Sequence, residues 1–84
     1  MYYVYVFMCS NAKLYVGYSA NLQKRIAQHK AGEVFSTKNK LPLELIFYEA
    51  FADQSDAKRR EMYLKTTAGK RALKLMFRKS IERK

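Results

Sequence analysis

The amino-acid sequence predicts one small α+β domain. Residues 2–8 are β-branched or aromatic almost throughout, which is typical of a strand. Residues 22–31 repeat apolar side chains at helical spacing, and more amphipathic helices follow in the second half. The 84 residues match one domain, and a hydrophobic share of 49% is enough for a packed core, so we assign residues 1–84 to a single domain.

The first strand is predicted to form a hairpin. Residues 9–12 favour a turn, and residues 13–18 are predicted as the returning strand. Because side chains alternate across a strand, a loop with an odd number of residues would place Tyr5 and Tyr15 on the same side of the sheet, even directly opposite each other. A loop with an even number would separate them, and the sequence leaves this register open.

The helix over residues 22–31 carries two polar side chains on its apolar face. Asn21 is a suitable N-cap and Gly32 a suitable end. Arg25 and His29 lie at helical spacing from apolar neighbours, so both are expected to point inward. They are candidates for a functional site, although a structural ion pair and a hydrogen-bonded core histidine are the simpler alternatives.

The second half predicts one strand and two helices. Residues 43–51 are apolar on both faces and are expected to form a central strand, after a polar loop. A helix capped within residues 53–56 is expected to run to about Thr67, with Glu61 on its apolar face. Gly69 is expected to break this pattern before a basic amphipathic helix that reaches Ile81.

Charge points to a polyanionic partner. The formal net charge is +10, and residues 58–84 hold eleven basic against two acidic side chains. Nucleic acid is the simplest such partner, and a solvated basic surface is the alternative. No apolar run is long enough to span a membrane, and the basic helix lacks the tryptophan-rich face of an interfacial anchor. The lone Cys9 excludes an internal disulfide and fits a reducing, cytoplasmic location.

The inward polar side chains have defined chemical uses. The guanidinium of Arg25 matches two phosphate oxygens. An inward Glu61 carboxylate must be paired, either with Arg25 or with a hard cation such as Mg²⁺. A tyrosine such as Tyr5 has an ordinary pKa near 10, so it needs cationic neighbours or a metal-bound water before it acts as a base.

These residues occur in an order that resembles the GIY-YIG nuclease superfamily, over nearly the whole chain. The matching segments are Tyr3-Val4-Tyr5, Tyr15-Val16-Gly17, Arg25-x-x-x-His29 and Arg59-Arg60-Glu61-x-x-Leu64-Lys65. The chain is most similar to the small stand-alone members, which are related to the cutting domain of the UvrC excision-repair subunit. The resemblance implies a three-stranded antiparallel sheet flanked by about three helices.

The resemblance also implies a metal-dependent DNA endonuclease, serving DNA repair or processing. Tyr5 would act as general base toward water, Tyr15 would hydrogen-bond within the site, and His29 would orient Tyr5 or relay its proton. Arg25 would stabilise charge on the scissile phosphate. Glu61 would hold one Mg²⁺ or Mn²⁺.

Two departures from the family pattern stand out. Tyr3 replaces the glycine of the first motif, which is expected to narrow the cleft. Some relatives use a late asparagine, and this chain has none beyond Asn39, so that duty would pass to Lys65, Thr66 or water. A catalytically weak or inactive nucleic-acid-binding module of the same fold is therefore the main alternative, and a basic protein that docks an acidic partner is the third.

These 84 residues are not expected to include the appended DNA-binding domain that larger relatives carry, so sequence selectivity is expected to come from this domain or from a partner. A protein partner could supply specificity, and both a monomer and a homodimer are compatible with the sequence. Basic side chains of the loop and the later helices are the candidate contacts to the DNA backbone: Lys38, Lys40, Lys65, Lys70, Arg71 and Lys74.

Overall fold

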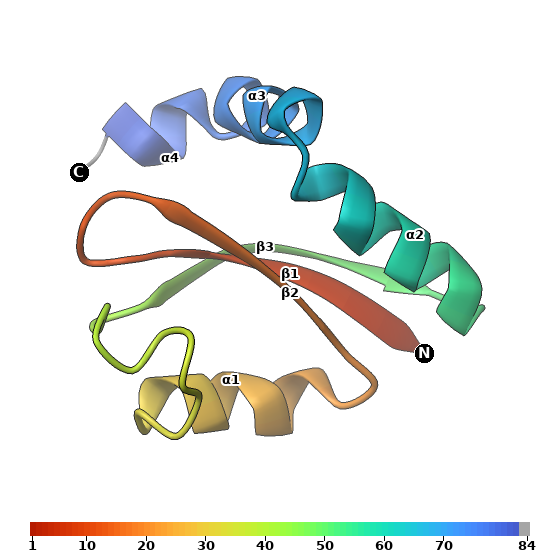
Figure 1. Ribbon diagram of the computed structural model, residues 1–84, viewed down its shortest axis with the longest axis horizontal. Coiled ribbons are helices and arrows are strands. Elements are labelled where there is room, and N and C mark those ends of the chain that lie inside the picture. Colours follow the sequence, from red (N-terminus) through yellow and green to blue (C-terminus); the bar gives the residue numbers. More distant parts are fainter. Residues whose placement is uncertain (83–84) are drawn as a thin grey trace.

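A three-stranded antiparallel sheet lies between one helix on one face and three helices on the other (Figure 1). The computed structural model describes residues 1–82. The elements are β1 (Tyr2–Met8), β2 (Leu14–Ser19), α1 (Leu22–Lys30), β3 (Glu44–Phe51), α2 (Gln54–Leu64), α3 (Thr67–Met76) and α4 (Arg78–Glu82). The α+β fold class and the antiparallel sheet are confirmed. Within residues 1–82, no helix is long and apolar enough to cross a membrane.

The central strand is β1, and it separates two apolar cores. Val4 and Val6 pack with residues of α2 and α3, whereas Tyr5 and Phe7 pack toward α1 on the other face. This division follows from the two-residue alternation of strand side chains. The aromatic residues that the sequence singles out therefore lie on the α1 side of the sheet.

The expectation that residues 43–51 form a central strand was wrong. The strand order is β2-β1-β3, so β3 lies at an edge. Its register with β1 shifts between Val6 and Phe7, where Phe47 and then Leu45 are the successive partners. Because of this irregularity, the consecutive residues Ile46 and Phe47 both pack against the core that contains Val4 and Val6. The run of apolar residues in β3 therefore arises from the register shift, and not from a position between two other strands.

The second and third helices differ from their predicted bounds. The helix expected to reach Thr67 ends at Leu64, and the basic helix is divided into α3 and α4 around Phe77. Thr66 caps α3: its hydroxyl donates to the Tyr63 carbonyl at 2.6 Å and accepts from the Gly69 amide at 3.1 Å. The chain therefore changes direction three residues before the expected break.

Gly69 has a packing role rather than a helix-ending one. It lies inside α3, and a Cβ atom there would come within 2.1 Å of the Tyr63 carbonyl oxygen. Only glycine allows the start of α3 to lie this close to the end of α2.

Candidate active site

The hairpin register gathers the motif tyrosines on the α1 face. Met8 pairs with Leu14, which leaves five residues in the loop, so the odd-numbered case holds. Tyr5 and Tyr15 therefore face the same side. They are not directly opposite, because Tyr5 pairs with Gly17 and Phe7 pairs with Tyr15.

Gly17 makes room for the Tyr5 ring. A Cβ atom at Gly17 would lie 2.2 Å from Cζ of Tyr5, far inside van der Waals contact. The phenol thus crosses the backbone of β2 where only glycine leaves space. The second motif ends in glycine because the tyrosine of the first motif occupies that position.

A buried hydrogen-bond chain joins the sheet, α1 and the following loop. The Tyr5 hydroxyl lies 2.8 Å from Nε2 of His29, and Nδ1 of His29 lies 2.7 Å from Oγ1 of Thr37. His29 and Thr37 are 0% exposed and Tyr5 is 1% exposed. The Tyr15 ring packs edge-on against the imidazole, with centroids 5.4 Å apart. The predicted inward orientation of His29 is confirmed, and both ring nitrogens have partners.

His29 is neutral at physiological pH. Burial, and to a smaller degree the Arg25 guanidinium, lowers the pKa of His29 from 6.5 to about 4. A neutral imidazole has one donor and one acceptor nitrogen. It can therefore accept the Tyr5 proton or donate to the Tyr5 oxygen, depending on its tautomer.

The variant His29→Gln is expected to remove a pH dependence of stability. Between the folded pKa of about 4 and the unfolded value of 6.5, the unfolded chain binds a proton that the folded chain does not. The free energy of unfolding therefore falls as pH drops through that window, by about 3 kcal/mol in total. Urea unfolding across the window should show this extra loss in wild type and not in the variant; parallel curves would contradict it.

The Tyr5 phenol is held in its protonated form. Its pKa is raised above 10.0, first by burial and further by Tyr15 and Glu61, whereas the neighbouring Arg25 guanidinium lowers it. The raising influences prevail. Tyr5 therefore needs additional positive charge, or a higher pH, before it can accept a proton.

Arg25 and Glu61 both act electrostatically on Tyr5 but do not pair with each other. Arg25 Nη1 donates to Oε1 of Gln28 at 3.3 Å, whereas Glu61 pairs with Nζ of Lys65 at 3.0 Å. The Arg25–Glu61 pair considered from the sequence is thus replaced by a pair between Glu61 in the last turn of α2 and Lys65, the C-cap residue of that helix. The Glu61 side chain is 20% exposed, so its inward orientation is partial.

A metal ion at this site would depend mainly on non-protein ligands. No group of three or more His, Cys, Asp or Glu side chains that could hold a metal occurs within the described chain, residues 1–82. Glu61 offers one carboxylate. This donor set fits Mg²⁺ or Mn²⁺, which use one or two carboxylates with waters and substrate phosphate, and it does not fit an all-protein cage.

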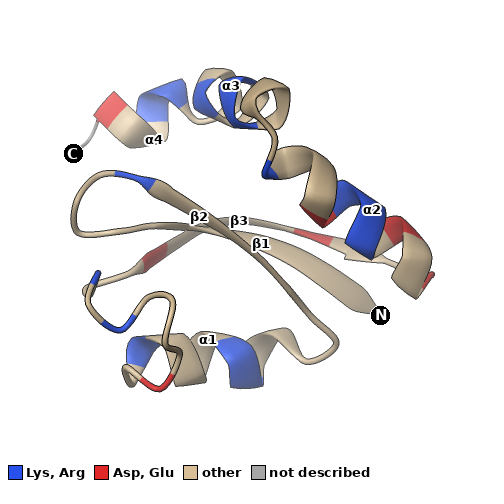
Figure 2. Ribbon diagram, in the orientation of Figure 1, with Lys and Arg blue, Asp and Glu red and all other residues tan. Residues whose placement is uncertain are grey.

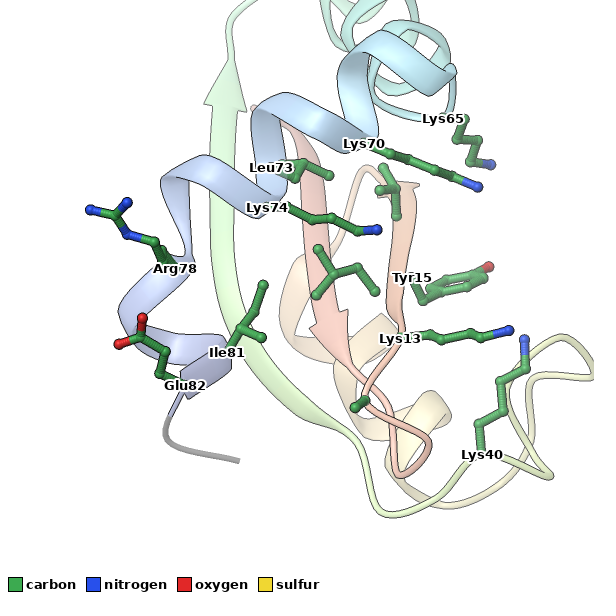
Figure 3. Close-up of a pocket in the computed structure, with 13 residues that line it drawn as sticks. Lys13, Tyr15, Lys40, Lys65, Lys70, Leu73, Lys74, Arg78, Ile81 and Glu82 are labelled. Carbon is green, nitrogen blue, oxygen red and sulfur yellow. The ribbon is translucent and has the colours of Figure 1, made fainter.

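A basic groove borders this site along the edge strand β2. Its volume is about 770 Å³, and it lies between the hairpin and the α3–α4 helices. Figure 3 shows the side chains of Lys65, Lys70 and Lys74 extending toward the side where Tyr15 lies, whereas Arg78 and Glu82 point away. The lining residues are Ala12, Lys13, Leu14, Tyr15, Val16, Lys40, Lys65, Lys70, Leu73, Lys74, Arg78, Ile81 and Glu82.

The groove contains four of the six predicted DNA contacts: Lys40, Lys65, Lys70 and Lys74. Arg71 lies on an exposed position of α3 outside the lining, and Lys38 stacks over the ring of Phe35, with Nζ 4.8 Å from the centroid. Figure 2 shows Lys and Arg on all four helices, in the hairpin and in the loop before β3, whereas β1 has none. Five of the lysines, Lys13, Lys40, Lys65, Lys70 and Lys74, line the same groove as Tyr15.

Sequence reasoning missed Thr37, Lys13 and Arg78. Thr37 stands in a loop with several hydroxyl and amide side chains, and no periodicity distinguishes it. The available signal was His29 itself, because a buried histidine needs a hydrogen-bond partner for each ring nitrogen. That need indicates that a second partner exists, without identifying it as Thr37. Lys13 joins the groove only because the hairpin lies beside α3.

The structure shows the surroundings of Tyr3, which replaces the glycine of the first motif, and of Thr66, one of the expected substitutes for the late asparagine. The Tyr3 ring packs edge-on against Tyr48 of β3, with centroids 6.3 Å apart, so it is directed toward β3 and away from the β2 side that carries Tyr15. The Thr66 hydroxyl is used in capping α3. Of the expected substitutes for the late asparagine, this favours Lys65 or water.

The fold and site define a class: small α+β domains with tyrosine, arginine and histidine on one sheet face and a carboxylate on a later helix. Residues 1–74 match the family model described as the GIY-YIG catalytic domain. The chain belongs to the GIY-YIG family, which is a family of nucleases.

Several curated relatives cover most of the chain. UPF0213 protein SH2523 of Staphylococcus haemolyticus is 40% identical over 76 residues, 89% of this chain and 93% of the relative. UPF0213 protein CPE1444 of Clostridium perfringens is 36% identical, covering 98% and 89%. UPF0213 protein NP_0776A of Natronomonas pharaonis is 41% identical, covering 77% and 78%. No solved structure matches the chain at a comparable level.

Proposed function

We propose that this chain is a divalent-metal-dependent endonuclease that hydrolyses phosphodiester bonds in DNA. The observation that carries the proposal is the juxtaposition of the Tyr5–His29 pair, Arg25 and a lysine-lined groove that meets them at Tyr15. Family membership supports the reaction class.

The groove is suited to the DNA backbone. Lysine ammonium groups contact phosphates without reading bases, so this surface would bind DNA with little sequence preference and with strong salt dependence. Tyr15 stands at the boundary between the groove and the buried pair, since it lines the groove and packs against His29. A phosphate in the groove near Tyr15 would be the one presented for cleavage.

Tyr5, His29 and Arg25 would supply the acid–base and charge chemistry. The phenolate form of Tyr5, which has released its own proton to solvent, would accept a proton from the attacking water, and the Nε2–H tautomer of His29 would donate to the phenolate oxygen across the 2.8 Å contact. Arg25 offsets the negative charge that grows on the phosphate as the new bond forms. The same guanidinium lowers the pKa of Tyr5 and so favours its phenolate.

Glu61 is the residue that would hold the metal, Mg²⁺ or Mn²⁺. When bound, such an ion polarises the phosphate and stabilises the leaving oxygen. Lys65, which pairs with Glu61 at 3.0 Å, keeps the carboxylate oriented beside the groove and is itself available to a phosphate.

We assign the activity to DNA repair or processing in the cytoplasm. The family and the lone buried Cys9 support this, together with the resemblance to an excision-repair nuclease. A protein partner would add specificity for a DNA structure.

A nucleic-acid-binding module with weak or no catalysis is the second candidate. The near-complete burial of Tyr5 favours this second candidate, because a general base must contact the attacking water in order to accept its proton. Salt-sensitive DNA binding without cleavage would identify this module. Nicking of plasmid or branched DNA by the purified chain with Mg²⁺ or Mn²⁺ would identify the enzyme.

A further inference from the structure

Thr37 is a buried hydroxyl in a mostly exposed loop. The side chain is 0% exposed, whereas Phe35, two residues earlier, is 74% exposed. The Thr37 amide donates to the Val34 carbonyl at 3.1 Å, and the Thr37 carbonyl accepts from the Lys40 amide at 2.9 Å. These turns fix the backbone so that the hydroxyl points inward to His29.

The contact explains why a polar side chain is buried there. A hydroxyl removed from water costs free energy unless it is hydrogen-bonded, and an imidazole nitrogen in the same place has the same need. The 2.7 Å separation between Oγ1 of Thr37 and Nδ1 of His29 satisfies both groups.

From this geometry we infer that Thr37 is a positioning residue for the site: its hydroxyl holds the His29 imidazole so that Nε2 faces the Tyr5 hydroxyl. A hydroxyl can donate or accept, so it pairs with Nδ1 in either neutral tautomer. In one tautomer Tyr5 donates to Nε2. In the other Nε2–H donates to the Tyr5 oxygen, which is the arrangement that stabilises a phenolate.

The Thr37→Val variant tests this role because valine keeps the shape and removes the hydroxyl. His29 is the only histidine in the chain, so its two ring nitrogens give unambiguous ¹⁵N NMR signals. In the variant, Nδ1 loses its hydrogen-bond partner. A buried lone pair without a partner costs less free energy than a buried N–H without one, so Nδ1 is expected to be the unprotonated nitrogen. The nitrogen shifts should therefore move toward the Nε2–H tautomer or show a rotated ring, and the pH titration of His29 should change.

Thr37→Ser and Ser36→Ala serve as matched controls. Serine keeps the hydroxyl, so its His29 spectrum and activity should stay close to those of wild type. Ser36 is the adjacent exposed hydroxyl, and its removal should change neither. On DNA cleavage, Thr37→Val should lower kcat at least about tenfold with KM nearly unchanged, because an imidazole without the Thr37 contact is free to rotate and no longer keeps Nε2 facing the Tyr5 hydroxyl, whichever tautomer it adopts.

The effect on rate rests on the proposed nuclease function, whereas the effect on the imidazole does not. A His29 spectrum of Thr37→Val that superimposes on wild type at every pH would overturn the inference, whatever the activity. Altered His29 signals in a chain that cuts no DNA would support Thr37 and reject the nuclease.

Discussion

The Glu61→Gln variant is expected to lose DNA cleavage by at least about 1,000-fold, the scale of several kcal/mol that a metal ion contributes to phosphoryl chemistry. Glutamine keeps the shape but not the charge that would hold Mg²⁺ or Mn²⁺. DNA binding should be retained or become tighter, because the groove lysines remain and Lys65 is released from its ion pair.

Cleavage and binding must be measured separately to interpret this variant. Single-turnover cleavage of labelled DNA gives the rate, and fluorescence anisotropy without metal gives the affinity. Glu33→Gln is the matched control, since Glu33 is an exposed carboxylate after α1 and should behave as wild type. Equal loss of binding and cleavage, or cleavage at the wild-type rate, would count against Glu61 as the metal-binding residue.

Tyr5→Phe is expected to lower the cleavage rate by about 100-fold or more, the usual contribution of a general base. Because the pKa of Tyr5 is raised above 10.0, its phenolate fraction grows about tenfold per pH unit across the neutral range. The wild-type rate should therefore climb with pH, and the residual rate of the variant should be flat.

Tyr2→Phe is the control for this loss, because it makes the same chemical change in the same strand on the opposite face. The fold of Tyr5→Phe should be retained, since the ring still fills the space over Gly17. A variant that keeps both the wild-type rate and the pH slope would show that another group accepts the proton.

Local patterns predicted the parts of the site that lie on regular elements. Helical spacing placed His29 inward and Arg25 at a half-buried position, and strand alternation placed Tyr5 and Tyr15 on one face once the loop length was known. The inward orientation of Glu61 was predicted only in part. The apolar helix face on which it was placed was expected to continue to about Thr67, whereas α2 ends at Leu64.

Features that depend on contacts between distant segments were not predictable. The irregular register beside Phe47 made the edge strand β3 look central. Thr37 lies in a loop where only the need of the His29 imidazole for a second partner selects it. The groove exists because the hairpin carrying Lys13 lies beside α3, and no local pattern records that packing. Gly69 lies where the backbone of α3 approaches the end of α2, and a glycine at such a contact cannot be distinguished in the sequence from a glycine that ends a helix.

Metal-dependent strand cleavage by the wild-type chain tests the central claim most directly. Purified protein would be incubated with supercoiled plasmid and with branched oligonucleotides, in Mg²⁺, in Mn²⁺ and in EDTA. We predict nicked products with either metal and none in EDTA, at a rate that rises with pH. Intact DNA under all three conditions, with DNA binding preserved, would contradict the enzyme and leave the binding module as its function.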